Sequence, residues 1–276
     1  MKERSIKQKV NGRPAIDGAG VHLVRILGHD TVYDFDPFLL LDSFDSLYPD
    51  DYTRGFPMHP HRGIETITYL VEGEIEHEDS IGNKGLISSG QSQWMTAGSG
   101  ILHQEMPLAS PRMLGLQFWL NLSAKEKMTA PKYFDITGNM IGIKSEPGAL
   151  VRVIAGQYKE VNGIRSPHIP TTLYDVSLEA GASISLSTKE EETVFVFLLE
   201  GDGIVAGEQV SEKTAVLLVD GDAVTITAPS DNRTRFVFAM AKPLREPISW
   251  GGPIVMNTKE ELQKTFAELK EGTFIK

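Results

Sequence analysis

The stretch YLVEGE at residues 69–74 returns, slightly altered, as FLLEGD at residues 197–202, an offset of 128 residues. A second match follows in the same order. Gly90 and Gly221 are each followed six residues later by Thr-Ala, an offset of 131. Fixed-period similarity is typical of repeated structural units, so the two matches predict a duplicated domain.

Both copies have the composition of many-stranded antiparallel proteins, with short β-branched and aromatic runs separated by Gly, Pro, Asn and Asp. Residues 114–122 have leucine or phenylalanine at every second position, with Gly115, Gln117, Trp119 and Asn121 on the other face, and predict a half-buried strand. Residues 79–85 have the Gly and Asn of a hairpin turn. One helix is expected near the end, capped by Asn257 or Thr258 and closed by Gly272. We therefore expect an all-β protein with two tandem barrels and a short C-terminal helix.

The domain boundaries follow from the repeat. Residues 128–147 contain Pro and Gly but few periodic residues, which is typical of a linker. The N-terminal domain is therefore expected at residues 1–127. The C-terminal domain, with the terminal helix, is expected at residues 148–276.

The composition limits the function. A formal net charge of −10 argues against direct binding to nucleic acid or to anionic membranes, which depends on basic surface. The sequence has no apolar run of eighteen residues and no secretory signal at its start, so we expect a cytoplasmic protein. It has no cysteine, so any metal must be held by nitrogen and oxygen atoms.

Two short motifs supply such atoms. His59 and His61 are two residues apart, and on a strand such side chains point to the same face. His103 and Glu105 repeat this spacing with a carboxylate. On neighbouring strands the two pairs would form a site with three nitrogen ligands and one oxygen ligand. This donor set suits one divalent ion such as iron(II), manganese, nickel, copper, zinc or cobalt, and it does not suit calcium.

The repeat provides an internal control for these motifs. The 128-residue offset carries His59 and His61 to Ser187 and Lys189, and the 131-residue offset carries His103 and Glu105 to Thr234 and Phe236. None of these sets forms a metal cage. The second barrel is therefore expected to lack a metal and to have a structural or regulatory role.

The motif region resembles the pirin family of bicupins. The resemblance lies in HPHRGIETITYL at residues 59–70, HED at residues 77–79 and QWMTAGSGILHQEMP at residues 93–107, with weaker similarity at residues 251–257. It implies two tandem cupin barrels and an Fe(II)-type metal in the first. It also implies a dioxygenase that opens a flavonol such as quercetin. The ligands implied by the resemblance are His59, His61, His103 and Glu105.

The general cupin pattern would instead select His59, His61, Glu65 and His103 as ligands. The resemblance to pirins favours Glu105, and Glu65 is then expected to lie behind an imidazole and to orient its N–H group. Glu105 is also the candidate catalytic base, because a carboxylate near the metal could accept the hydroxyl proton of a flavonol. The roles of the two glutamates could be exchanged.

Two functions from different classes remain open. The first is the dioxygenase, which takes a small aromatic substrate and dioxygen. The second is a metal-dependent, redox-sensing regulatory protein that acts through a protein partner, as the resemblance to animal pirins implies. A zinc-dependent hydrolase using Glu65 is a third, weaker hypothesis. A monomer is expected, because two fused barrels already supply the equivalent of a cupin dimer. The candidate apolar walls of a substrate site are Phe56, Met58, Trp94, Met106 and Phe118.

Overall fold

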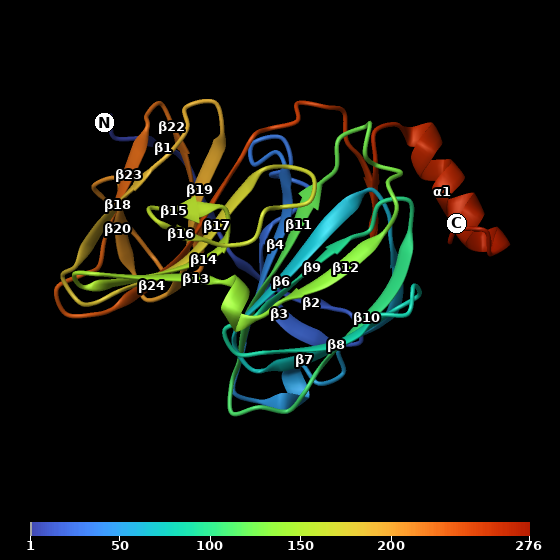
Figure 1. Cartoon of the computed structure of the whole chain (residues 1–276), viewed down its shortest axis with the longest axis horizontal. Coiled ribbons are helices and arrows are strands. Elements are labelled where there is room, and N and C mark those ends of the chain that lie inside the picture. Colours follow the sequence, from blue (N-terminus) through green and yellow to red (C-terminus); the bar gives the residue numbers. More distant parts are fainter. Residues whose placement is uncertain (1) are drawn as a thin grey trace. The chain divides into compact units, whose positions relative to one another are not determined.

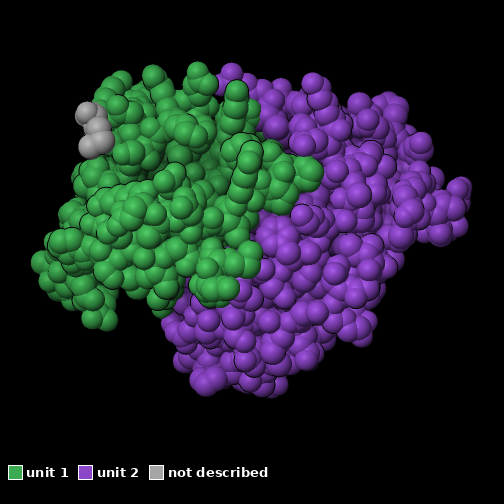
Figure 2. Space-filling model, in the orientation of Figure 1, with its two compact units in different colours: residues 1–13, 33–37, 138–243 green, residues 14–32, 38–137, 244–276 purple. Residues whose placement is uncertain are grey.

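The computed structural model describes residues 2–276 and divides them into two compact units, coloured separately in Figure 2. Unit 1 comprises the described residues up to Arg13 together with residues 33–37 and 138–243. Unit 2 comprises residues 14–32, 38–137 and 244–276. Each unit therefore combines segments that are distant in the sequence.

Unit 2 is built from two antiparallel sheets (Figure 1). The larger has seven strands in the order β12-β9-β6-β11-β4-β3-β2, and the smaller has four in the order β5-β10-β7-β8. The strand bounds are β2 Arg13–Asp17, β3 Val21–Leu27, β4 Phe38–Ser46, β5 Phe56–His61, β6 Ile64–Glu72, β7 Glu74–Asp79, β8 Lys84–Ser88, β9 Ser92–Thr96, β10 Ile101–Pro107, β11 Met113–Asn121 and β12 Lys132–Ile136.

Unit 1 repeats this arrangement with its own strands. Its larger sheet has the order β1-β22-β19-β24-β17-β14-β13, and its smaller sheet has the order β18-β23-β20-β21. The strand bounds are β1 Ser5–Asn11, β13 Gly142–Glu146, β14 Ala149–Ala155, β17 Thr171–Leu178, β18 Ser183–Ser187, β19 Thr193–Glu200, β20 Gly203–Val205, β21 Glu208–Val210, β22 Thr214–Val219, β23 Ala223–Thr227 and β24 Thr234–Ala241.

The two strand orders correspond position by position, which confirms the predicted duplication. The first sequence match is structurally correct, because residues 69–72 end β6 and residues 197–200 end its counterpart β19. The second match is wrong. Thr96 ends β9, whereas Thr227 ends β23, the counterpart of β10. The hairpin β20–β21 is shorter than β7–β8, so the offset falls to 122 residues between the first residues of β10 and β23.

This change in offset also corrects the internal control. Thr234 and Phe236 lie on β24, the counterpart of β11, and so they do not occupy the positions of His103 and Glu105. The true counterpart of β10 is β23, with the sequence Ala-Val-Thr-Ile-Thr. It contains neither histidine nor carboxylate. The contrast between the two barrels therefore holds, with different residues.

The units differ from the predicted domains at both ends of the chain. β1 is hydrogen-bonded to β22, so the N-terminal segment belongs to unit 1. The helix α1 (Lys259–Glu271) belongs to unit 2. The expected linker at residues 128–147 is also structured, because it supplies β12 to one sheet and β13 to the other.

The predicted local elements can be compared one by one. Thr258 caps α1 in a capping box with Glu261, and Gly272 ends it in the left-handed conformation, as expected. The predicted hairpin is β7–β8. β11 is a strand as predicted, and it lies between β4 and β6 in the middle of a sheet, but both of its faces are buried and not only one. The remaining elements are β15 Gln157–Tyr158, β16 Val161–Asn162, β25 Ser249–Gly251, β26 Ile254–Met256 and two short 3₁₀ turns, Pro49–Asp51 and Gly138–Met140.

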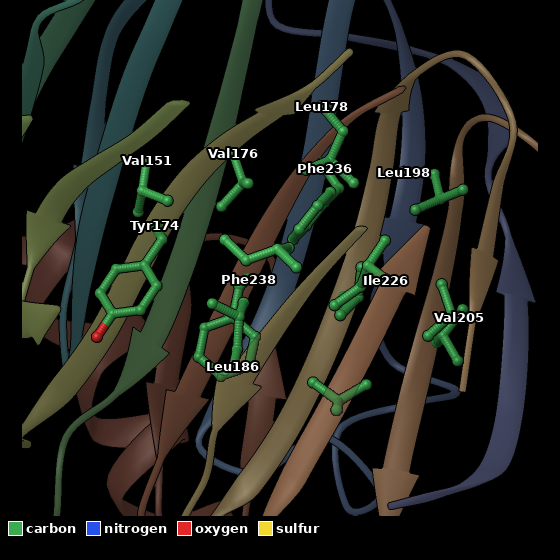
Figure 3. Packing of buried hydrophobic residues seen from close by; sticks show 14 of the residues in the cluster. Val151, Tyr174, Val176, Leu178, Leu186, Leu198, Val205, Ile226, Phe236 and Phe238 are labelled. Carbon is green, nitrogen blue, oxygen red and sulfur yellow. The ribbon is translucent and has the colours of Figure 1, made fainter. Parts of the chain in front are cut away.

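The interior of unit 1 is filled by apolar side chains. Figure 3 shows Val151, Val176, Leu186, Phe236 and Phe238 packed together within it. All five are at most 1% exposed, so the barrel interior is a closed core. Among residues 2–276, no helix is long and apolar enough to cross a membrane.

Candidate metal centre

Three of the four predicted ligands converge in unit 2. β5 and β10 are antiparallel neighbours, and their register makes His59 and His103 direct cross-strand partners. His61 shares the face of His59 because it lies two residues further along β5. The metal-binding nitrogen atoms of the three histidines lie within 4.8 Å of one another. The strands thus create a cluster of three imidazoles, as the spacing predicted.

The ring nitrogens of this cluster are arranged for a cation. Nδ1 of His59 lies 2.9 Å from the Pro57 carbonyl oxygen, and Nδ1 of His61 lies 3.1 Å from that of Pro253. Because carbonyls only accept hydrogen bonds, both Nδ1 atoms carry the hydrogen and both Nε2 atoms present lone pairs. These Nε2 atoms are 3.1 Å apart. Two facing lone pairs repel each other, and a cation bound to both would relieve that repulsion.

His103 completes the fit to a metal. Its side chain is fully buried, and neither ring nitrogen has a hydrogen-bond partner among the described residues. Buried polar atoms are normally satisfied, so such a nitrogen points to a missing ligand. Burial also lowers the pKa of His61 to about 3 and lowers the pKa of His59 and His103. The three imidazoles are therefore neutral near pH 7, which is the form that binds metals.

Glu105 lies close by but outside this nitrogen cluster. Its carboxylate accepts hydrogen bonds from the Thr68 hydroxyl at 2.7 Å, the Gln117 amide at 3.3 Å and the Gln93 amide. Burial raises the pKa of Glu105 to about 7, and these three hydrogen bonds act in the opposite direction. The carboxyl group can therefore hold or release a proton near neutral pH.

The Thr68 hydroxyl lies between two oxygen atoms, and the protonation state of Glu105 decides to which of them it donates. Thr68 Oγ1 lies 2.7 Å from Glu105 Oε1 and 2.5 Å from Gln117 Oε1. A hydroxyl has only one hydrogen, so it cannot donate to both oxygens. If Glu105 is protonated, it donates its hydrogen to the Thr68 oxygen, and the Thr68 hydroxyl donates its own hydrogen to the Gln117 amide oxygen. If Glu105 is ionised, the Thr68 hydroxyl can donate to its carboxylate instead.

Glu65 lies on a different surface from the one expected. The residues of β6 alternate between its faces, and Glu65 is on the face opposite to Thr68. Its carboxylate accepts a hydrogen bond from Thr96 at 2.7 Å, and it does not line the cavity described below. This position does not favour the ligand set with Glu65, nor its expected place behind an imidazole. The alternation of side chains along β5 cannot be counted on from His61 to Glu65, because the chain passes from one sheet to the other at Arg62 and Gly63.

His77 lies beside the histidine cluster, although the sequence motifs did not select it as a ligand. Its buried ring stacks on Tyr133 with centroids 4.0 Å apart, and it lies 5.3 Å from the ring of His103. Nε2 of His77 is 3.4 Å from an Asp79 carboxylate oxygen. The only sequence signal was the spacing of His77 and Asp79, which repeats that of His103 and Glu105.

A cavity of about 580 Å³ in unit 2 opens onto His59, His61 and Glu105. Of the predicted apolar walls, only Phe56 lines it; Trp94 and Phe118 are buried in the core instead. The other walls come from strands distant in the sequence. The apolar lining residues include Leu40, Phe44, Phe56, Trp119 and Trp250, and the polar ones include Asp17, Arg25, His29, Asp42 and Gln117.

Comparison with known proteins agrees with this architecture. Residues 20–120 match the family model described as Pirin, and residues 173–275 match that of the Pirin C-terminal cupin domain. The chain belongs to the pirin family. Its two barrels are therefore the two cupin domains of that family, as the resemblance implied.

Individual relatives cover nearly the whole chain. Human Pirin is 37% identical over 97% of the chain and 92% of its own length. A crystal structure of quercetin 2,3-dioxygenase from Acinetobacter baumannii is 33% identical, has a TM-score of 0.90, and covers 99% of this chain and 98% of its own. The pirin YhhW from Escherichia coli, solved with nickel(II), is 22% identical with a TM-score of 0.65. It covers 86% of this chain and 98% of its own, and the likeness to it shows the fold alone.

In this pirin-family chain the C-terminal hairpin β25–β26 lies against the end of the ligand strand. The Val255 amide donates to the Arg62 carbonyl at 3.1 Å, next to the contact between His61 and Pro253. There is no space for a side chain at Gly63, whose φ is +79°, because a Cβ atom would lie 1.9 Å from the Val255 carbonyl oxygen. The hairpin therefore depends on glycine at this position.

Gly63→Ala should lower the free energy of unfolding more than Gly82→Ala does. Gly82 also has a positive φ, +94°, but a Cβ atom there meets nothing within 4 Å. Both variants incur the strain of an alanine at positive φ, and only Gly63→Ala adds a backbone clash, which should cost about 1–3 kcal/mol more. Urea denaturation measures the difference. Equal losses in the two variants would contradict the importance of the close approach.

Proposed function

We propose that this protein is a metal-dependent dioxygenase of the pirin type that opens a flavonol such as quercetin with dioxygen. His59, His61, His103 and Glu105 would hold the metal. The observation that supports this most directly is the cluster of three neutral imidazoles, with His61 and His103 buried and His59 half-buried, at a cavity large enough for a small aromatic molecule. Fe(II) is our choice of metal; manganese, nickel, copper, zinc and cobalt accept the same donors.

Two comparisons add support. The solved relative from Acinetobacter baumannii is named a quercetin 2,3-dioxygenase, and the identity of 33% over almost the whole chain makes a shared chemistry reasonable. The pirin YhhW was solved with nickel(II), which agrees with a metal in this family. Neither comparison selects the metal of this protein.

The metal would supply the redox chemistry and the binding site for the oxygen atoms of the flavonol. The chain supplies the surroundings. Trp119 and Trp250, whose ring centroids are 5.6 Å apart, form an apolar wall suited to an aromatic ring system and exclude water from it. Glu105 would accept the proton of the 3-hydroxyl group, because burial brings its pKa to about 7.

Oxygen uptake by metal-free protein reloaded with one metal at a time tests this function. We expect quercetin and dioxygen to be consumed in equal amounts with a redox-active metal such as iron(II). Zinc, which binds the same donors but is not redox-active, is the matched control and should give no uptake. Tight binding of every metal with no oxygen uptake would contradict the dioxygenase and favour the regulatory alternative that acts through a protein partner.

A further inference from the structure

A continuous row of polar residues crosses the larger sheet of unit 2. Each member is the register partner of the next on the neighbouring strand. The four central members are buried, with Thr68 and Gln93 each 1% exposed. In the order of strands β3, β4, β11, β6, β9 and β12, the row consists of Arg25, Asp42, Gln117, Thr68, Gln93 and Asp135.

The corresponding row of unit 1 is apolar on the five strands that match β3, β4, β11, β6 and β9. The offset of 128 residues carries Thr68 to Val196, and the register partners of Val196 continue the row on the matching strands. Tyr174 and Phe238, two of its members, are seen in the packed interior in Figure 3. In the same strand order, these five members are Val153, Tyr174, Phe238, Val196 and Val216, and the row ends on β1 with the charged Lys9.

This contrast separates what the fold needs from what the site needs. Burying polar side chains costs free energy unless all of them are hydrogen-bonded, and an apolar row serves the same barrel well. Unit 1 shows that the fold accepts valine at the position of Thr68. A polar row that the architecture does not require points to a functional role in unit 2.

The hydrogen bonds of the row converge on one group. When Glu105 is ionised, the Thr68 hydroxyl and the amides of Gln93 and Gln117 all donate to its carboxylate, which faces the row from β10 of the smaller sheet. Gln93 is itself held from the other side, because the Tyr133 hydroxyl lies 3.0 Å from its amide oxygen. The position of Glu105 is therefore set by a hydrogen-bonded framework, with Thr68 at its centre.

We propose that Thr68 is a positioning residue that holds Glu105 in the orientation required beside the three histidines. The proposal rests on the proposed metal site. It assigns Thr68 no contact with the substrate. Its hydroxyl links the two glutamine-bearing strands to the carboxylate, and the polar row keeps the carboxylate from turning away from the histidine cluster.

Three variants test this role. Thr68→Val removes the hydroxyl at nearly constant volume and installs the residue that unit 1 already uses. Thr68→Ser retains the hydroxyl. Thr66→Val is the matched control, because Thr66 is buried on the same face of β6 and its hydroxyl has no hydrogen-bond partner among the described residues. Each protein is loaded with cobalt(II), whose visible spectrum reports the ligands around the ion, and its flavonol turnover is then measured with iron(II).

Thr68→Val should remain folded, change the cobalt spectrum, and lower metal affinity or kcat by roughly 10–100-fold with little change in KM. Thr68→Ser should restore the wild-type spectrum, and Thr66→Val should leave it unchanged. A wild-type cobalt spectrum and kcat in Thr68→Val would overturn the proposal. If the wild type consumes no flavonol, the proposed function fails, but the cobalt spectra still decide the role of Thr68.

Discussion

His61→Ala should abolish tight metal binding and quercetin consumption together. The imidazole of His61 is buried, its Nδ1 hydrogen is directed to the Pro253 carbonyl, and its Nε2 faces that of His59. Removing it leaves two nitrogen ligands where three converge, and no other histidine belongs to the nitrogen cluster among the described residues. Elemental analysis of purified protein and an oxygen electrode measure the two losses.

His22→Ala is the control for this experiment. His22 has a side chain that is 57% exposed and lies 3.3 Å from Asp51, away from the cluster. It should retain both metal and activity. Comparing the thermal unfolding of both variants in the presence of chelator separates loss of metal from loss of fold. A His61→Ala protein that keeps its metal, or that still consumes oxygen with quercetin, would refute the assignment.

Arg62→Met should produce the largest loss of stability. The guanidinium group is 2% exposed, and it donates to the carbonyl oxygens of Ser99 and Phe274 at 2.6 and 2.8 Å. It also pairs with Glu268 at 2.6 Å and lies 4.4 Å above the Phe274 ring. Methionine retains much of the volume but removes the donor from the two carbonyl oxygens, and it leaves Glu268 with Lys276 as its remaining ion-pair partner. We expect the free energy of unfolding to fall by about 3–5 kcal/mol.

Tryptophan fluorescence during urea denaturation can measure this loss specifically. The chain has three tryptophans, at positions 94, 119 and 250, and all three belong to unit 2. Lys84→Met is the control, because it breaks the exposed ion pair between Lys84 and Glu78 and should change stability by less than about 0.5 kcal/mol. A loss below about 1 kcal/mol in Arg62→Met would show that the buried contacts contribute little.

The histidine cluster could be predicted from sequence because its rule is local. The alternation of a strand places His59 and His61 on one face, and no knowledge of the rest of the chain is needed. The same rule failed for Glu65, because it was extended across a change of sheet. Gly63 adopts a positive φ between the two strands, and the alternation starts anew in β6.

Features that depend on long-range pairing could not be predicted in this way. The register that aligns Thr68 with Gln93 and Gln117 is visible only when three strands are placed side by side. The contact between Arg62 and Phe274 joins positions 212 residues apart. The repeat match between Thr96 and Thr227 is false. The hairpins of the two copies differ in length, and a search at a nearly constant sequence offset does not account for that difference.

Unit 2 combines segments that are distant in the sequence, and this affects the order in which its contacts can form during synthesis. The strand that presents His61 is translated well before the residues that hold it in place. Pro253 lies 192 residues after His61, and Phe274 lies 212 residues after Arg62. All of the strands of unit 1 are translated before them. The hydrogen bonds that fix the strand of His61 therefore form only after the strands of unit 1 have been translated.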